Sequence, residues 1–562
     1  MKILLIAVNA KYIHSNPAVF SLKACAGEFE PYITVLEFTI NQQPSDILRE
    51  IYKKKPDVVA FSCYIWNRTI IGDVICDLHK IMPDIDIWAG GPEVSYDGLN
   101  LIDEWKLRGV MVGPGEGTFY HLVSCYINGM DKSLPSILDG NGDLRLTLNQ
   151  IPFWYQDLKD FEHRIIYYES SRGCPFSCSY CLSSIDKIMD FRSVERVCDE
   201  LDFFLKNSVP QVKFVDRTFN CKKDHAIPIL RYILEHDNGV TNFHFEIAAD
   251  LLDEDYFFLL QQMRPGAVQL EIGVQSTNLQ TITEINRKMD FDKVAGIVRK
   301  ISSWNNIHIH LDLIAGLPYE DIDSFSHSFN DVYALYPEQL QLGFLKVLKG
   351  SAISDNVLKY HMVYTSIPPY EVLSNKWLSY EDVCHLKQIE EVLEIYYNSG
   401  QFSHSLNFLN LFFDTPYDLY DALALWYEEH DLFGVQSSRV RKYEVLLEFG
   451  LKYISGEESD DRQKELKEYI AYDLYLRENM KNRASFLYSM ETWKDRIHDL
   501  LHRESQCHTL FPELSQCNYR ELMKILHVEV FENIFDKPVF VIFWYDRRDS
   551  LTNNCIVKKV EI

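Results

Sequence analysis

Two stretches of this chain alternate short apolar runs with amphipathic segments, and this alternation is the strongest constraint on its fold. In residues 1–130 the apolar runs are "KILLIAV", "YITVLEFTI", "DVVAFSCY", "DIDIWAGG" and "GVMVGPG", and helical segments such as "PSDILREIYKKK" separate them. Strands that are apolar on both faces and joined by helices form parallel sheets covered on both sides. The first region therefore predicts a doubly wound parallel α/β domain.

Residues 165–350 repeat the alternation with six further strands. These are "RIIYYES", "QVKFVD", "NFHFEIAA", "AVQLEIGVQS", "IHIHLDLIAG" and "QLQLGFLKV". The helix after the first of them has a one-sided apolar stripe that begins behind an N-cap at Ser193. Six βα units in a region of this length predict a partial (β/α)6 barrel, smaller than the eight-unit form, with its chemistry on the loops that follow the strands.

The remaining segments do not show this alternation. Residues 131–164 mix turn dipeptides, prolines and aromatics, which is typical of a connector. Residues 360–562 predict a mainly helical domain of unknown role, with a helix over "SYEDVCHLKQIEEVLEIYYNSG" that stops at Gly400 and a terminal β-hairpin around "DSLTNN". The predicted domains are therefore 1–130, 165–350 and 360–562, joined after the first by the connector 131–164.

Composition and charge exclude several classes of protein. No apolar run approaches the roughly 20 residues that span a bilayer, and "MKILLIAVNA" has no small-residue cleavage site, so we expect a cytoplasmic protein without membrane contact. The 13 cysteines are mostly scattered, as thiols of a reducing compartment are. A net charge of −26 argues against a large phosphate-binding surface, so nucleic acid is not an expected partner.

Polar residues and glycines follow the strands of the first domain. Ligands of doubly wound sheets bind beyond the carboxyl ends of the strands. The candidate residues there are Asn9, Tyr12, His14, Ser62, Tyr64, Gly90, Gly91, Glu93, Gly113 and Gly115. The glycines either allow a ligand to approach the backbone or are simple turn residues. No G-x-G-x-x-G follows the first strand, so the dinucleotide fingerprint is absent.

The first loop of the predicted barrel contains "SSRGCPFSCSYCLSS", which gathers Cys174, Cys178 and Cys181 in a C-x3-C-x2-C arrangement. A structural zinc site needs four ligands, usually in two pairs, and only an isolated Cys221 offers a fourth thiol nearby. Iron–sulfur clusters also use thiolates. Three ligands on a 4Fe-4S cube leave one iron open. An open coordination position distinguishes a catalytic metal site from a structural one.

The cysteine spacing, Tyr180 before the last cysteine, and the position in a six-unit barrel together resemble the S-adenosylmethionine (SAM) radical superfamily. The upstream doubly wound domain is similar to the class of that superfamily with an N-terminal cobalamin-binding domain. The resemblance covers residues 1–350, and the C-terminal part resembles the extra domain of an uncharacterised branch. It implies a 4Fe-4S cluster held by the three cysteines, SAM chelated at the open iron, and reductive cleavage of SAM to a 5′-deoxyadenosyl radical.

The resemblance also implies contacts to both cofactors. The residues at family positions for SAM are Tyr180, Asp216, Phe219, Glu246, Gln275, Ser276, Asp312 and Gly316. Glu246, Gln275 and Asp312 are alternatively polar residues of the barrel rim with ordinary hydrogen-bonded partners. The ten polar and glycine positions of the first domain are the corresponding cobalamin candidates.

The first domain departs from the family pattern at the cobalt ligand. Cobalamin domains often carry D-x-H-x-x-G, whose histidine ligates cobalt, but "NAKYIHSNP" has no acid two residues before His14 and no glycine after it. Without the acid that orients such an imidazole, His14 is interpreted as a loop or core residue. Ser62 resembles the serine of the S-x-L element that lines the nucleotide tail of cobalamin in the family, but Tyr64 replaces its leucine.

These patterns predict a cobalamin-dependent radical SAM enzyme that methylates an unactivated carbon. The alternatives are a cobalamin-dependent radical rearrangement, RNA modification of the methylthiolation type, and a non-enzymatic cobalamin or redox sensor. The expected partners are a small-molecule or peptide substrate and an electron donor such as flavodoxin or ferredoxin.

Overall fold

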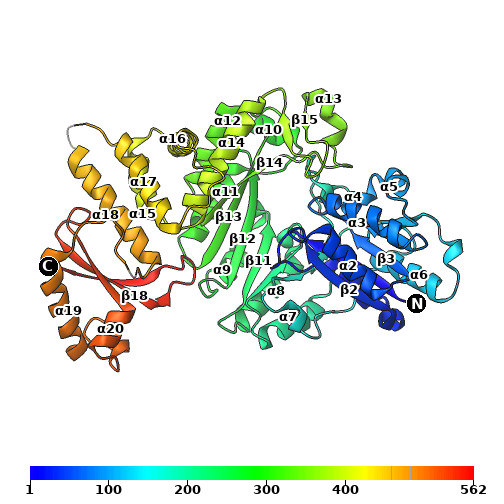
Figure 1. The fold of residues 1–562 in the computed structure, drawn as a ribbon, viewed down its shortest axis with the longest axis horizontal. Helices are drawn as coiled ribbons and strands as arrows, with labels where there is room; N and C mark the ends of the chain where they lie inside the picture. Colours follow the sequence, from blue (N-terminus) through cyan, green and yellow to red (C-terminus); the bar gives the residue numbers. More distant parts are fainter. Residues whose placement is uncertain (457–458, 481, 562) are drawn as a thin grey trace. The chain divides into compact units, whose positions relative to one another are not determined.

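The computed structural model describes residues 1–456, 459–480 and 482–561 (Figure 1). The chain forms two compact units. The first contains residues 1–325 and 343–380, and the second contains residues 326–342 and 381–562. Among the described residues, no helix combines the length and the apolar content that crossing a bilayer requires.

The first unit begins with a six-stranded parallel sheet in the order β2-β1-β3-β4-β5-β6. Its strands are β1 (Ile3–Asn9), β2 (Ile33–Thr39), β3 (Val58–Ser62), β4 (Asp86–Gly90), β5 (Gly109–Val112) and β6 (Ile137–Asp139). The sequence predicted the first five strands. The edge strand β6 comes from the segment that was predicted as a connector, so this connector also completes the sheet.

Both faces of this sheet are covered, as the apolar strands require. Leu4, Ile6 and Val8 pack into a core with α2 (Pro44–Lys54), α3 (Arg68–Ile81) and α5 (Gly98–Trp105). The alternate residues Ile3, Leu5 and Ala7 pack into a second core with α1 (Pro17–Cys25) and α6 (Glu116–Ile127). Successive side chains of a strand point to opposite faces, so one apolar run builds two cores. The doubly wound fold is confirmed.

The second sheet has the order β14-β13-β12-β11-β10-β7, and the strands from β7 to β13 pair in parallel. Its strands are β7 (Ile166–Tyr168), β10 (Gln211–Phe214), β11 (Asn242–Ile247), β12 (Val268–Gln275), β13 (Ile307–Ala315) and β14 (Gln339–Phe344). The helices along this region are α7 (Val194–Lys206), α8 (Lys223–Glu235), α9 (Glu254–Leu260), α10 (Leu279–Glu284), α11 (Phe291–Ser302) and α12 (Ile322–Tyr333). The six predicted strands are all present, and the Ser193 hydroxyl accepts from the Arg196 amide as the predicted N-cap.

The second unit is mainly helical and ends in a three-stranded antiparallel sheet, β17-β18-β19. Its elements are α15 (Ser403–Leu409), α16 (Pro416–Glu429), α17 (Arg439–Tyr453), α18 (Ser459–Arg477), α19 (Lys494–Cys507), α20 (Tyr519–Ile525), β17 (Leu526–Phe531), β18 (Val539–Arg548) and β19 (Cys555–Glu561). The helix α14 (Tyr380–Leu393) precedes them and continues as a π-helical turn to Asn398. Gly400 then adopts a φ of +61°, the left-handed stop that was predicted, and β18 and β19 form the predicted hairpin.

Candidate active site

The cysteine loop begins at the end of the first barrel strand. A short antiparallel pair, β8 (Ser171–Arg172) and β9 (Asp190–Phe191), closes the base of this loop. Gly173 enters it with a φ of +95°, and a Cβ at this position would lie 2.4 Å from the carbonyl oxygen of Ile188. Only glycine therefore fits where the chain turns towards Cys174.

Cys174, Cys178 and Cys181 line one cavity of about 220 Å³, which we call the cysteine cavity. Cys174 and Cys178 are buried and Cys181 is half-buried, and all three are free thiols. Among the described residues, no fourth cysteine lines this cavity. Three thiols beside an open space fit a 4Fe-4S cluster with one iron left for another ligand.

Arg287 is a cation in direct contact with one of these thiols. Its Nη1 lies 3.8 Å from Cys178 Sγ and donates to the Tyr180 hydroxyl at 3.2 Å, and its Nη2 donates to the carbonyl of Gly273. The Arg287 guanidinium would offset part of the negative charge of a cluster held by these cysteines. No sequence pattern pointed to Arg287, because it follows a helix more than 100 positions after the cysteines.

Three of the predicted SAM residues from the barrel strands, Glu246, Gln275 and Asp312, also line the cysteine cavity, together with Tyr180. Burial raises the pKa of Glu246 to about 7, against the opposing charge of Arg217. Burial likewise raises the pKa of Asp312, whose Oδ1 lies 3.0 Å from His310 Nε2. The structure thus brings the cysteines and these three polar side chains to one side of the barrel.

The other predicted SAM residues do not line this cavity. Asp216 is fully buried and accepts from the Ser170 amide at 2.8 Å and the Ser171 hydroxyl at 2.9 Å, and burial raises its pKa to about 6. Phe219 packs against Phe214 and Phe245. The Ser276 hydroxyl donates to Glu320, and the carbonyl of Gly316 accepts from Asn375. These four residues support the loops around the cavity.

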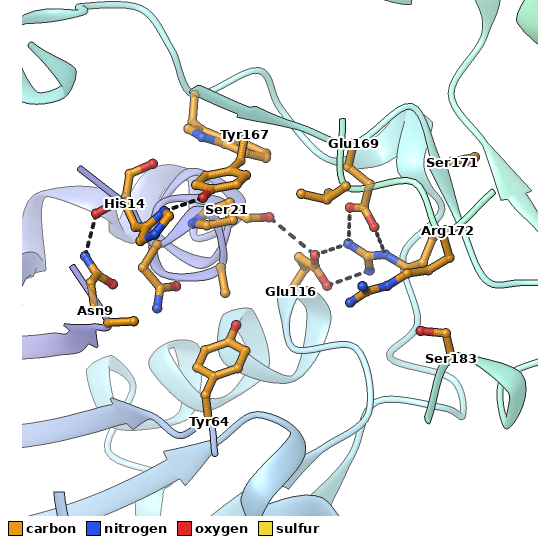
Figure 2. Close-up of a pocket in the computed structure, with 18 of the residues that line it drawn as sticks. Asn9, His14, Ser21, Tyr64, Glu116, Tyr167, Glu169, Ser171, Arg172 and Ser183 are labelled. Carbon is orange, nitrogen blue, oxygen red and sulfur yellow. Dashed lines mark hydrogen bonds and ion pairs between the residues drawn. The ribbon is translucent and has the colours of Figure 1, made fainter. Parts of the chain in front are cut away.

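A second cavity, of about 630 Å³, lies where the loops of the first sheet meet the barrel, and we call it the interdomain cavity. Figure 2 shows His14, from the loop after β1, beside Tyr167 of the barrel, with Tyr64 below them in this view. His14 Nδ1 and the Tyr167 hydroxyl lie 2.6 Å apart. Burial lowers the pKa of His14, which keeps this imidazole neutral near pH 7.

A buried ion pair forms one wall of the interdomain cavity (Figure 2). Arg172 of β8 donates to Glu116 of α6 at 2.7 Å and to Glu169 at 2.7 Å. Although burial opposes ionisation, the Arg172 charge holds the pKa of Glu116 below its usual value. Arg172 thus connects the barrel to the first domain, and two carboxylates share its single positive charge.

A third space of about 210 Å³, the glycine slot, opens between the first sheet and α1. Its lining includes most of the predicted cobalamin residues that follow β3, β4 and β5, namely Ser62, Tyr64, Gly90, Gly91, Gly113 and Gly115. Gly91 has a φ of +109°, and a Cβ there would lie 2.4 Å from the carbonyl oxygen of Cys63. Because backbone forms much of this wall, the slot stays open to a flat group.

Asn9, His14 and Tyr64 line the interdomain cavity, whereas Tyr12 and Glu93 line neither space. Tyr12 is 62% exposed. Glu93 is buried and accepts from the Tyr370 hydroxyl at 2.8 Å. The interdomain cavity and the glycine slot adjoin, because Ala18, Tyr64 and Glu116 line both.

A partial parallel barrel with three thiols in its first loop, beside a doubly wound domain with a glycine slot, defines the class of B12-binding radical SAM proteins. Family comparisons agree with this class: residues 3–123 match the B12 binding domain and residues 168–332 match the radical SAM superfamily. The chain thus contains a domain that matches the B12 binding domain, followed by a domain that matches the radical SAM superfamily. Residues 358–543 match a family described as a protein of unknown function, DUF4080.

Individual relatives agree with these domains. The cobalamin-dependent radical SAM methyltransferase TokK of Streptomyces tokunonensis is 24% identical over 314 residues, 48% of this chain and 44% of TokK. The hopanoid C-3 methylase of Methylococcus capsulatus is 24% identical over 284 residues, 44% of this chain and 51% of that protein. The matched part therefore spans about half the length of these curated relatives.

Solved structures share the fold. The radical SAM methyltransferase TsrM of Kitasatospora setae, solved with cobalamin and a [4Fe-4S] cluster, superposes with a TM-score of 0.56 at 15% identity. The match covers 84% of this chain and 99% of that chain.

Proposed function

We propose that this protein is a cobalamin-dependent radical SAM methyltransferase that transfers a methyl group to an unactivated carbon of a small-molecule or peptide substrate. One observation carries the proposal: the cysteine cavity and the interdomain cavity share two wall residues, Ser183 and Arg217. A substrate between the two cavities can meet both cofactors. When bound, a reduced 4Fe-4S cluster supplies the electron that cleaves SAM, and methylated cobalamin supplies a methyl group.

The residues of this chain would hold and orient the reactants. Cys174, Cys178 and Cys181 would ligate three irons, with Arg287 offsetting the charge that the thiolates bring. Glu246, Gln275 and Asp312 would face SAM across the same cavity. We retain Asp216, Phe219, Ser276 and Gly316 as positioning residues, because their contacts fix the loops after the barrel strands.

The first domain would bind cobalamin along its carboxyl edge. Tyr64 lines both the interdomain cavity and the glycine slot and would therefore contact the corrin where the tail enters. The neutral His14 imidazole is held by the Tyr167 hydroxyl, so we assign it to the wall of the cavity and not to cobalt. Tyr12 and Glu93 have no role in this proposal.

We place the reaction in the reducing cytoplasm, with a flavodoxin or ferredoxin as electron donor. All 13 cysteines are free thiols, and clusters of this type need a low-potential donor. A nucleic-acid substrate is disfavoured by the net charge of −26.

The test is anaerobic incubation of protein reconstituted with iron, sulfide and hydroxocobalamin, using SAM with a CD3 methyl group and a reduced flavodoxin. We expect both 5′-deoxyadenosine and S-adenosylhomocysteine, with CD3 in the product. Formation of 5′-deoxyadenosine without S-adenosylhomocysteine would favour a cobalamin-dependent rearrangement. Absence of both products from fully loaded protein would exclude either reaction and leave the sensor hypothesis.

A further inference from the structure

The inner face of the barrel is unusually polar. The parallel register places Lys213, His244 and Gln269 in one row across β10, β11 and β12. A second row contains Glu246, Glu271 and His310 on β11, β12 and β13. Branched apolar residues dominate the interior of closed eight-stranded barrels. Here ionisable groups take those positions, and two of them, Glu246 and Glu271, line the cysteine cavity. A hydrocarbon substrate there would desolvate them without compensation.

Most of these charges are already paired within the protein. Glu271 Oε2 lies 3.0 Å from Lys213 Nζ and 2.9 Å from His244 Nε2. His310 Nε2 lies 3.0 Å from Asp312 Oδ1. Although burial opposes ionisation, His244 and Lys213 lower the pKa of Glu271 to about 2, so this carboxylate stays charged. We call these five paired side chains, Lys213, His244, Glu271, His310 and Asp312, the polar floor. Because they are paired, they leave little charge for a ligand.

Arg217 is different. It follows β10, is exposed, and lines both the cysteine cavity and the interdomain cavity. Among the described residues, its guanidinium has no hydrogen bond or ion pair. The other arginine of the interdomain cavity, Arg172, is neutralised by Glu116 and Glu169. Apart from the effect of its charge on the pKa of Glu246, Arg217 is thus a cation without a direct partner among the described residues, on the wall that the two cavities share.

The lining of the cysteine cavity includes two further cations, Arg287 and Lys288. Arg287 is engaged by Tyr180, Cys178 and Gly273, and Lys288 lines the cysteine cavity but not the interdomain cavity. Lys288 is therefore available for the carboxylate of SAM without help from Arg217. A guanidinium presents a planar fork of donors that matches a carboxylate or a phosphate.

We propose that the substrate of this enzyme is a small polar molecule with an oxyanion, a carboxylate or a phosphate, which the Arg217 guanidinium binds between the two cavities. This inference rests on the proposed methyl transfer. It excludes neutral lipids and other uncharged hydrocarbons as substrates, because they would leave Arg217 without a partner and would desolvate the part of the polar floor that lines the cysteine cavity.

The experiment uses the low-molecular-mass extract of cells that naturally make the protein and from which its gene has been deleted, so that the substrate accumulates. A strong anion exchanger at pH 7 divides this extract into a retained pool and a flow-through pool. Each pool is incubated with reconstituted holoenzyme, CD3-labelled SAM and reduced flavodoxin, and the labelled product is measured. Treatment of the retained pool with a phosphatase before incubation distinguishes a phosphate, whose labelling is lost, from a carboxylate, whose labelling remains.

Arg217→Gln, Arg217→Lys and the control Arg231→Gln are compared with the wild type. Arg231 is an exposed arginine on α8 that lines neither cavity. We expect label in the retained pool, at least about a tenfold increase in KM for Arg217→Gln, partial recovery for Arg217→Lys, and wild-type values for Arg231→Gln.

Three results would overturn the inference and leave methyl transfer intact. Label in the flow-through pool would show an uncharged or cationic substrate. Labelling by Arg217→Gln equal to the wild type would remove Arg217 from substrate binding. Loss of SAM affinity in Arg217→Gln, measured by equilibrium dialysis, would assign its oxyanion to SAM. Absence of 5′-deoxyadenosine and of label from the wild type in both pools would instead refute the proposed function itself, and the inference with it.

Discussion

Cys174, Cys178 and Cys181 are the side chains on which the proposed cluster depends. Replacement of any of them by alanine is expected to abolish cluster absorbance, to reduce iron to background, and to abolish 5′-deoxyadenosine formation, because two thiolates cannot retain the cube. Iron analysis and product chromatography of anaerobically reconstituted protein measure this. The matched control is Cys198→Ala on α7, which lines no part of the cysteine cavity. A variant that lacks all three thiols and still cleaves SAM would contradict the assignment.

Glu246 predicts a specific pH dependence of stability. Its pKa rises from an ordinary value of 4.5 to about 7 because burial disfavours the charged form. Below pH 4.5 the carboxyl is neutral in both the folded and the unfolded chain, and Glu246 does not destabilise the fold. As the pH rises from 4.5 to about 7, ionisation favours the unfolded chain, and the free energy of unfolding falls. Relative to the wild type, Glu246→Gln should gain up to about 3 kcal/mol above pH 7 and nothing near pH 4.5.

The measurement is the difference in thermal midpoint between Glu246→Gln and the cofactor-free wild type across this pH range. Glu235→Gln, at the exposed end of α8, is the control and should show no pH-dependent difference. A constant offset between Glu246→Gln and the wild type at every pH would refute the burial argument.

Sequence reasoning reached those residues whose roles follow from spacing or strand position. The C-x3-C-x2-C spacing identified the thiols, and the family resemblance identified Glu246, Gln275 and Asp312, which line the same cavity. Arg287 and Tyr167 were missed because only the folded chain brings them to the site. Arg217 lies between the predicted SAM residues Asp216 and Phe219, but its lack of a direct partner is a three-dimensional property.

At the scale of elements, the glycine slot depends on the turn that joins β4 to the short helix α4 (Pro92–Ser95). Gly91→Ala is expected to lose at least about 2 kcal/mol of stability, because its φ of +109° and the Cys63 carbonyl at 2.4 Å both oppose a Cβ. The displaced turn should also narrow the slot and weaken cobalamin binding. Thermal unfolding and the visible absorbance of bound cobalamin measure the two effects.

Gly142→Ala is the control for this substitution, because a Cβ at Gly142 would meet no atom within 4 Å and its φ is not positive. Unchanged cobalamin binding by Gly91→Ala would remove the slot from the cobalamin site.

Element identity was predicted well where a segment has its own apolar period, as in β1 and α7. The edge strand β6 was not predicted, since three residues carry no period and only pairing with β5 makes them a strand. The domain boundary near residue 350 was equally invisible in local patterns: residues 326–342 follow a barrel strand in sequence but belong to the second unit.

At the scale of the whole molecule, residues 326–342 belong to the second unit although they lie between segments of the first. We therefore predict that removing the C-terminal residues disrupts the part of the chain that remains. Phe329 and Tyr333 pack against aromatic side chains of later helices: their ring centroids lie 5.7 Å from Tyr417 and 5.0 Å from Tyr397. Truncation after residue 380 would expose both apolar rings. We expect the product to aggregate, measured as soluble yield and size-exclusion profile beside the full chain.

Substitution of Phe329 and Tyr333 by serine in the truncated chain is expected to restore part of the solubility, which ties aggregation to these rings. A truncated chain that is soluble, monodisperse and able to bind its cluster without those substitutions would show that the second unit is dispensable for folding.

The interleaving of the two units also has a consequence for synthesis. Residues 326–342 leave the ribosome before residues 381–562. The Phe329 and Tyr333 rings therefore stay exposed until their packing partners have been synthesised. We therefore expect the nascent chain to need a chaperone that covers these rings during this interval. A cluster inserted before the C-terminal residues are synthesised would enter a chain whose fold is incomplete.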